Sequence, residues 1–346
     1  MSLNAMGWSA FFESNTTDTS KIARVTAIFR SHISARTSEK EINLYYTGQP
    51  IESLAVGDWV TISPEFIDEQ NKTAAVILSV LDRKSKLARI DNDEEQVLAA
   101  NVDRVFIVTS ANQDFNIKRL QRYLVLVKEG GSQPVIILSK VDLTEDPCQL
   151  IDTLSSQLKT EVIATSTVEN IGRDAILMLM PEGSTSVFVG SSGVGKSTLV
   201  NFLMGHHQQK IREIRYDDDK GKHTTTTRQL FSIPGYGMII DTPGLRAVQV
   251  YGSETSLQDT FPEISQRLSQ CRFSDCQHET EPGCAIQSAL ESGELSLKDW
   301  ESYLKLLKEI KYSIRKTDKQ EMSNSKRRWK SIHKNVRAKR KFEDRE

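Results

Sequence analysis

Short apolar runs alternate with polar turns in the first part of the chain, from about residue 20 to about residue 95. The runs KIARVTAIF, INLYYTG, GDWVTI and AAVILSVL are separated by turn sequences such as TSEK, TGQP, AVGD and DEQNK, and an apolar repeat of helical period is missing. Runs of this length, bounded by turn residues, are typical of β-strands. The pattern predicts a small all-β barrel or sandwich.

After about residue 100 the pattern changes to an apolar strand followed by a helical stretch, repeated along the chain. VDRVFIVTSA precedes IKRLQRYLVLVKEG, PVIILS precedes DPCQLIDTLSSQL, EVIATS precedes GRDAILMLM, and TSVFVG precedes GKSTLVNFLMG. FSIPGYGMIIDTPG then predicts two strands around a Pro-Gly turn. Strands that alternate with helices indicate an α/β fold with a parallel, doubly wound sheet.

The rest of the chain combines three cysteines, a helical segment LSLKDWESYLKLLKEIKYSIRK and a basic tail. A chain of 346 residues has room for two or three hydrophobic cores. We therefore expect a multidomain α/β protein. Its parts would be a β domain with an N-terminal extension at residues 1–98, an α/β domain at 99–250, and a helical domain with the basic tail at 251–346.

The composition is that of a soluble globular protein, with 38% hydrophobic and 26% charged residues. No apolar run approaches the ~20 residues of a membrane helix, and the N-terminus lacks the pattern of a signal peptide. We expect a cytoplasmic protein with no membrane partner. The net charge of −1 conceals KRRWKSIHKNVRAKRK, residues 326–341, which has nine Lys or Arg residues and no acid.

A phosphate-binding loop is predicted at residues 190–197. GSSGVGKS matches G-x-x-x-x-G-K-[ST] and lies between a predicted strand and a predicted helix, as the motif requires. Backbone N–H groups would face the phosphates, Lys196 would bridge the β- and γ-phosphates, and Ser197 would ligate Mg²⁺. The alternative is a glycine-rich turn without a ligand. The expected nucleotide contacts are Gly190, Ser191, Ser192, Gly193, Val194, Gly195, Lys196, Ser197 and Thr198.

Two further segments complete a triphosphate site. DTPG follows the apolar strand YGMII, so Asp241 would hold the Mg²⁺ shell through water and the Gly244 amide would meet the γ-phosphate. Between the two motifs lies GKHTTTTRQL, where a threonine could close over Mg²⁺ and the γ-phosphate. We favour Thr225 among its neighbours. A solvated threonine-rich loop is the alternative.

The residue after DTPG is Leu245, where Ras-type switches have the glutamine that orients the attacking water. An aliphatic side chain cannot position a nucleophile. His223, inside the threonine loop, is the best substitute, and Arg246 is a weaker candidate that could stabilise charge. A surface histidine without a catalytic role stays open. The expected catalytic group is thus His223, with Lys196 and Thr225.

SKVD, residues 139–142, is one letter away from Asn/Thr-Lys-x-Asp, the motif with which guanine-nucleotide switches read their base. Asp142 would accept the N1–H and N2–H₂ donors of guanine, which adenine cannot supply, and the Lys140 stem would lie along the base plane. Val141 completes the motif, and Ser139 departs from it.

A second base loop is expected at Ser166 and Thr167, whose backbone amides would bind the guanine O6; Thr167 is a further departure. An ATP-using enzyme with an accidental SKVD is the alternative.

The base-reading motif precedes the phosphate loop here, whereas guanine-nucleotide switches have the opposite order. Each motif follows a strand of the predicted parallel sheet, so joining the old termini and opening the chain between DTPG and SKVD would leave the site intact. A circular permutation therefore explains both motifs with one event.

The cysteines suggest a metal site. Cys271, Cys276, His278 and Cys284 give C-x₄-C-x-H-x₅-C, and three thiolates with one imidazole fill a tetrahedral Zn²⁺ shell, which predicts a structural site. Buried, reduced cysteines are the alternative, and Cys148 is a poor ligand candidate.

Two regions suit a nucleic-acid backbone. The basic tail, with Trp329 and His333 interleaved, fits phosphates and occasional base stacking. Basic residues near the β domain add charge: Arg83, Lys84, Lys86 and Arg89. A solvated, disordered tail is the alternative.

The order of these motifs resembles the ribosome small subunit-dependent GTPase A family, permuted GTPases that act in late maturation of the bacterial 30S subunit. The resemblance covers nearly the whole chain. It rests on VGDWV, LDRKSKLAR, AANVDRVFIV, FNIKRLQRYL, LSKVDL, GSSGVGKSTLVNFL, GKHTTTT, IIDTPGLR and CRFSDCQHETEPGCA.

The resemblance implies an N-terminal OB-fold, a circularly permuted P-loop GTPase domain and a C-terminal zinc-binding helical domain. It also implies His223 as the catalytic residue, with GTP/GDP, Mg²⁺ and one structural Zn²⁺ as ligands. The expected partners are the small ribosomal subunit and its 16S rRNA, with no DNA, and the expected state is a monomer. An RNA-binding factor that senses GTP or GDP with little turnover is the alternative function.

Overall fold

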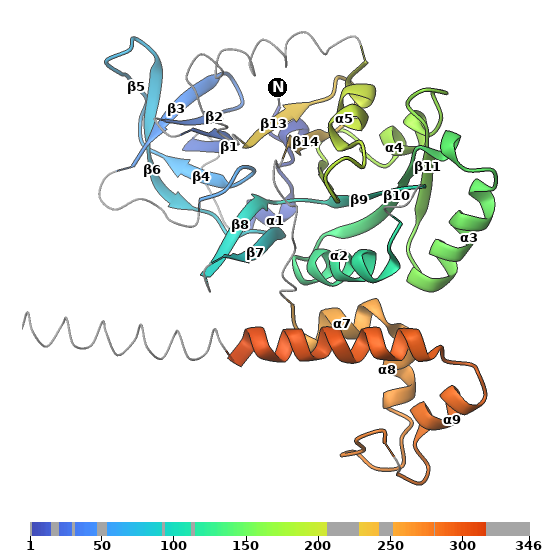
Figure 1. The fold of residues 1–346 in the computed structure, drawn as a ribbon. Helices are drawn as coiled ribbons and strands as arrows, with labels where there is room; N and C mark the ends of the chain where they lie inside the picture. The colour runs from blue at the N-terminus through green and yellow to red at the C-terminus, as the bar shows by residue number, and fades with distance from the viewer. Residues whose placement is uncertain are drawn as a thin grey trace, which may run out of the picture.

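The computed structural model describes residues 2–14, 21–29, 32–46, 54–91, 94–111, 115–205, 228–241, 252–279 and 281–315. Figure 1 shows a β-barrel, an α/β unit beside it and a group of helices below the α/β unit.

The strands are β1 (Ile22–Ile28), β2 (Ile33–Arg36), β3 (Glu41–Tyr45), β4 (Trp59–Ile62), β5 (Phe66–Ile67), β6 (Thr73–Val80), β7 (Lys86–Asp91), β8 (Glu94–Ala100), β9 (Arg104–Ser110), β10 (Gln133–Ser139), β11 (Val162–Thr165), β12 (Thr185–Val189), β13 (Arg228–Ser232) and β14 (Met238–Asp241). The helices are η1 (Asn4–Met6), α1 (Ala10–Glu13), α2 (Ile117–Glu129), η3 (Val141–Leu143), α3 (Pro147–Leu158), α4 (Arg173–Met178), α5 (Lys196–Met204), α7 (Glu254–Thr260), α8 (Pro262–Leu268), α9 (Ala285–Glu291) and a last one at residues 297–315.

Five strands form the predicted barrel, in the order β1-β2-β3-β6-β4, and β4 pairs with β1 to close it. The β3–β6 pair is parallel and the other pairs of the ring are antiparallel. This is the five-stranded topology of an OB-fold. Alternate residues of the strands point inward and form one apolar cluster, which includes Val25, Leu44, Val60 and Ile77.

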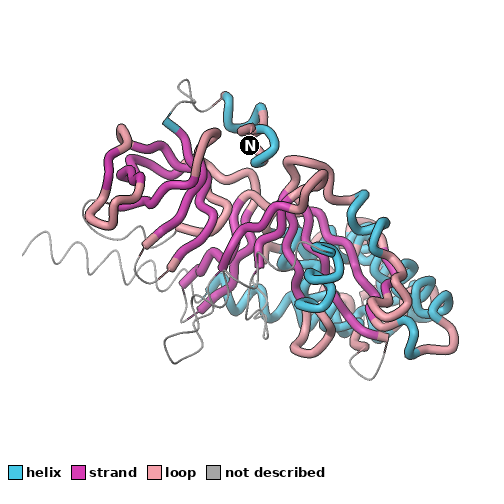
Figure 2. The backbone as a smooth tube through the Cα atoms, turned by 90° about the horizontal axis from the view of Figure 1, so that it is seen from above, coloured by secondary structure: helices cyan, strands magenta, loops and turns pink. Residues whose placement is uncertain are grey.

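The α/β unit contains the predicted parallel sheet. The strand order is β11-β10-β9-β12-β14-β13, and all neighbours are parallel except β13. Side chains of β9 alternate between two cores: Val105 and Ile107 pack with α2 and α3, whereas Phe106 and Val108 pack with α4 and α5. Helices therefore cover both faces of the sheet, as the view from above shows (Figure 2).

The β7–β8 hairpin was not expected from the sequence, in which charged residues interrupt its short strands KLARID and EEQVLAA. Its apolar side chains Leu87, Leu98 and Ala99 join the core under α2, not the barrel core. The domain boundary expected after residue 98 falls inside β8. Because the hairpin packs into the core under α2, it groups with the α/β unit. The division into domains otherwise stays a prediction.

A buried arginine lies where the barrel meets the α/β unit. There β1 also pairs with β13, which joins both sheets. Arg24 is 1% exposed and donates to the carbonyl oxygens of Met6 and Gly57 and to Thr185 Oγ1, the last at 2.9 Å. Burial lowers the pKa of Arg24 to about 10, against the opposing charges of Asp103 and Asp58. The junction thus combines the β1–β13 pairing with hydrogen bonds that one buried cation donates.

The C-terminal helices form their own core around Leu257, Ile286, Trp300 and Ile310, and this core includes Val125 of α2. They lie beneath α2 in Figure 1. Polar contacts fasten them to that helix: Arg122 to Glu309 at 2.6–2.7 Å, Lys128 Nζ to Asp259 O at 2.5 Å, and Glu129 Oε2 to Ser253 at 2.7 Å. The helical segment predicted at residues 295–316 is confirmed, as a helix at 297–315. None of the helices described here has the length and apolarity needed to cross a bilayer.

Candidate nucleotide-binding site and metal centre

The predicted nucleotide motifs meet at one edge of the parallel sheet. Because β10, β11, β12 and β14 run in the same direction, their carboxyl ends share an edge. SKVD begins at the last residue of β10, Ser166 follows β11, the phosphate loop follows β12, and Asp241 ends β14. β9 and β12 are neighbours in the sheet, but the chain continues from β9 to β10 and β11 on one side and from β12 to β13 and β14 on the other. The phosphate loop lies at this change of direction, the position at which such sheets bind ligands.

The phosphate loop has the backbone that its glycines predict. Gly190, Gly193 and Gly195 have φ of 144°, 82° and 97°, values that residues with a Cβ rarely adopt. A Cβ on Gly190 would also lie 2.3 Å from the carbonyl oxygen of Val108, so β9 passes too close for any side chain. The loop runs directly into α5, where Ser197 and Thr198 are exposed at the first turn.

Lys196 is folded over this loop. Its Nζ donates to Gly190 O at 2.7 Å and to Ser191 O at 2.6 Å. The ammonium group is therefore held above the backbone that the motif uses for phosphates. The first amides of α5 have no acceptor within the helix, so the loop has the donors and the cation that a polyphosphate requires.

SKVD is attached directly to the phosphate loop. Ser139 is 7% exposed, and its hydroxyl lies 2.8 Å from Val194 O and 3.1 Å from Thr109 O, both acceptors. Lys140 adopts a left-handed conformation with φ of 58° and donates from Nζ to Gly193 O at 3.0 Å. Val141 is buried, whereas Asp142 is exposed in the turn η3. The base-reading and phosphate-binding motifs thus form one assembly.

The second base loop is a tight turn. Ser166 is fully buried, its backbone pairs with Ile171, and its hydroxyl accepts a bond from Glu169 N at 3.1 Å. Thr167 is exposed next to it. Sequence reasoning missed Arg173, which donates to Phe202 O at 3.0 Å and Leu203 O at 2.9 Å at the end of α5. No local motif indicates such a contact between two helices.

Several predicted residues lie outside the described part of the chain. These are His223, Thr225, Gly244, Leu245 and Arg246, together with the basic tail at 326–341. Their roles stay predictions.

Three of the four basic residues expected to add charge beside the barrel are paired with acids, which offsets part of that charge. Arg89 contacts Gln96 at 2.9 Å. The ion pairs are Arg83–Asp58 at 2.6 Å, Lys84–Asp103 at 2.6 Å and Lys86–Glu95 at 2.5 Å.

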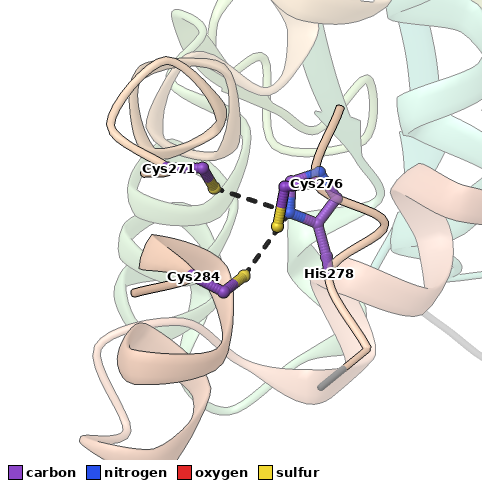
Figure 3. A group of neighbouring side chains, drawn as sticks. All are labelled: Cys271, Cys276, His278 and Cys284. Carbon is purple, nitrogen blue, oxygen red and sulfur yellow. Dashed lines mark hydrogen bonds between the residues drawn. The ribbon is translucent and has the colours of Figure 1, made fainter. Parts of the chain in front are cut away.

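The structure gathers the four predicted metal ligands. The ligand atoms of Cys271, Cys276, His278 and Cys284 all lie within 4.8 Å of one another. His278 Nδ1 is 3.5 Å from the sulfur atoms of both Cys271 and Cys284 (Figure 3). Zn–S and Zn–N bonds of about 2.3 and 2.0 Å place tetrahedral ligands about 3.6 Å apart, so the cluster fits zinc.

The surroundings of the cluster are also suited to a structural metal. Gln287 donates from Nε2 to His278 O at 2.5 Å and from its backbone N to Cys284 Sγ at 3.5 Å. The His278 ring lies 5.6 Å from that of Trp300, in the domain core. Burial, with a contribution from the neighbouring thiols, raises the pKa of Cys276 to about 11, a shift that a bound cation would oppose.

The sheet order and the reversed sequence of motifs define the class: a circularly permuted P-loop GTPase. The chain belongs to the RsgA GTPase family, whose model matches residues 80–251. The ABC transporter model also matches, at residues 174–341, a range that includes the phosphate loop.

Curated relatives cover most of the chain. Small ribosomal subunit biogenesis GTPase RsgA 2 of Vibrio parahaemolyticus is 40% identical over 318 residues, covering 89% of this chain and 85% of that protein. The protein of the same name from Listeria monocytogenes is 39% identical over 351 residues, 98% of each chain.

Solved structures agree with the permuted fold. YjeQ from Thermotoga maritima has a TM-score of 0.62 at 27% identity, covering 84% of this chain and 98% of that one. YloQ, described as a circularly permuted GTPase, has a TM-score of 0.60 at 26% identity, covering 84% and 94%.

Proposed function

We propose that this chain hydrolyses GTP, binds the small (30S) ribosomal subunit and acts in its late maturation, with hydrolysis stimulated by the subunit. A phosphate loop by itself serves ATP or GTP equally well. The observation that carries the proposal is the attachment of SKVD to the phosphate loop, through Ser139 to Val194 O and Lys140 to Gly193 O. A base placed against this motif would share one pocket with the phosphates.

Guanine selection would reside in Asp142. Its exposed carboxylate would accept two donors from guanine, and adenine would leave that carboxylate without partners. Lys140 would flank the base plane, and the backbone around Val141, Ser166 and Thr167 would close the pocket.

The triphosphate would lie over the phosphate loop. The amides from Gly190 to Thr198, including those of Ser191, Ser192 and Gly195, would bind its oxygens, and Lys196 would leave its loop carbonyls for the β- and γ-phosphates. Ser197, Thr225 and, through water, Asp241 would hold Mg²⁺. When bound, Mg²⁺ neutralises charge that develops on the phosphates during transfer.

Water activation would fall to His223, because Leu245 cannot orient water. When the threonine loop closes and the Gly244 amide binds the γ-phosphate, His223 would lie on the side from which water attacks. We propose it as the catalytic residue, beside Lys196 and Thr225.

The other domains would serve the ribosomal partner. The Cys₃His cluster would hold one structural Zn²⁺ and stabilise the C-terminal domain. The OB-fold barrel and the basic tail would contact 16S rRNA. A monomer acting in the cytoplasm, without DNA or membrane partners, is consistent with this role.

The experiment is phosphate release from GTP and from ATP, each with and without purified small subunits. We expect GTP-selective hydrolysis that rises strongly with the subunit, and loss of that selectivity in Asp142→Asn. His223→Ala should lose stimulated turnover but keep nucleotide binding. Slow hydrolysis that ignores the subunit would favour the alternative of a nucleotide-sensing RNA-binding factor, which Leu245 permits.

A further inference from the structure

One outward face of the barrel is apolar and exposed. In the strand register, Tyr45 of β3 is opposite Val76 of β6, and Phe66 of β5 is opposite Ala74. Leu78 lies one alternation further along β6. Tyr45, Phe66 and Leu78 are 38%, 42% and 64% exposed. We call Tyr45, Phe66, Val76 and Leu78 the barrel face. Contiguous exposed apolar side chains of this kind mark interaction sites.

Hydrogen bonds and a ring contact hold the barrel face in place. Asp68 Oδ1 accepts the backbone amides of Gln70 and Lys72, both at 2.9 Å, which fixes the turn after β5. Asp68 Oδ2 accepts the Tyr45 hydroxyl at 3.0 Å, and the Tyr45 and Phe66 rings lie 6.2 Å apart. An aromatic side chain held in one position loses little entropy on binding, as in the anchors of protein interfaces.

The charge around this face is negative. The described segments 36–45 and 65–72 contain five carboxylates and three cations, and two of those cations are paired, Arg36 with Glu41 and Lys40 with Glu65. The hydrogen bond to Asp68 raises the pKa of Tyr45, and burial and the negative charges of Asp68 and Glu69 add to the shift. A phosphate backbone would be repelled here, whereas surfaces that stack single-stranded bases carry a cationic groove.

We propose that the barrel face docks on a protein of the small subunit, against a segment that combines aliphatic side chains with Lys or Arg. The inference rests on the proposed function, because it takes the small subunit as the partner. Proteins that sit on rRNA need basic surfaces, and such a surface matches both the acids and the apolar centre of this face.

The test measures binding of the full-length protein to purified small subunits and to protein-free 16S rRNA. Leu78→Ser combined with Tyr45→Ser should weaken subunit binding by about tenfold or more, the loss typical of anchor residues, and leave rRNA binding unchanged. Met178→Ser, which alters an exposed apolar residue on α4, is the matched control. Intrinsic GTP hydrolysis should stay unchanged in all variants.

A charge-reversal variant distinguishes a basic protein partner from a phosphate partner, because the two predict opposite changes in binding affinity. Glu69→Lys lies on an exposed turn and should weaken subunit binding if the partner is basic protein, whereas a phosphate partner would be bound more tightly. Glu182→Lys, on an exposed loop of the α/β unit, controls for net charge. This variant also keeps the test decisive if the double variant fails to fold.

Parallel losses on subunits and on bare rRNA, tighter binding by Glu69→Lys, or no change in any variant would each overturn the inference. In those cases the wild-type protein still binds subunits, so the proposed function stands. Failure of the wild-type protein to bind subunits would overturn both.

Discussion

Replacing Ser139 with alanine tests whether the base-reading and phosphate-binding motifs act as one unit. The hydroxyl has a single proton, shared between Val194 O at 2.8 Å and Thr109 O at 3.1 Å. Alanine removes this donor from a site that is 7% exposed, where water cannot readily replace it. The lost hydrogen bond costs about 1 kcal/mol, and up to about 3 kcal/mol if Val194 O stays without a donor.

Part of that cost should appear as weaker nucleotide binding. GTP requires both motifs in their present arrangement, so a loosened pair must be ordered again when the nucleotide binds. Since about 1.4 kcal/mol corresponds to a factor of ten, a cost of about 1 kcal/mol sets the expected rise in Kd at up to about fivefold, and equally for GTP and GDP. Ser139→Asn should bind at least as well as the wild type, because its amide offers two donors for the two carbonyls.

The assay is titration with fluorescent GTP and GDP, alongside thermal denaturation. Ser132→Ala is the matched control, because Ser132 is 6% exposed and donates to Val102 O at 2.9 Å at the opposite end of β10. Both variants should lose stability, but only Ser139→Ala should bind nucleotide more weakly. Normal binding by Ser139→Ala, or an equal loss in Ser132→Ala, would refute the coupling of the two motifs.

Three other perturbations test further parts of the structure. Gly190→Ala should abolish nucleotide binding in the same titration, because its Cβ would lie 2.3 Å from Val108 O; retained binding would contradict that close approach. A double-mutant cycle of Arg122→Ala and Glu309→Ala should give a coupling of about 1 kcal/mol or less in chemical denaturation, since the two side chains are 26% and 32% exposed. Removing zinc with a chelator should change Trp300 fluorescence while GDP binding persists. The metal should be removed more easily as pH falls, because the cysteine and histidine ligands must be deprotonated to bind it. An unchanged Trp300 signal would argue against the metal site.

The local motifs were predictable because their chemistry is local. Gly190, Gly193 and Gly195 meet backbone demands within one loop, and the ligands Cys271 to Cys284 lie within one short segment. Strands such as β1, β9 and β12 were predictable from apolar runs. The β7–β8 hairpin was missed because its strands are short and the charged residues in KLARID and EEQVLAA interrupt the apolar pattern.

Long-range pairing was not predictable to the same degree. The closure of the barrel by β1 and β4, and the pairing of β1 with β13, join segments that carry no signal for each other. Arg24 reads as an ordinary basic residue in a strand, yet folding buries it at the junction. Arg83 and Lys84 looked like part of a positive patch until the fold placed Asp58 and Asp103 beside them.

The sequence by itself determined the chemistry of this protein: a phosphate loop, a base-reading motif ahead of it, and a Cys₃His cluster that fits zinc. Each depends on residue types at short spacing, which are present in the chain whatever its tertiary arrangement. Only the tertiary structure decided that Ser139 contacts Val194 and that α2 anchors the C-terminal helices. It also decided that the apolar barrel face stays exposed, with acids around it. These depend on which distant surfaces pack together, and packing is settled by the summed burial and hydrogen bonding of the whole chain.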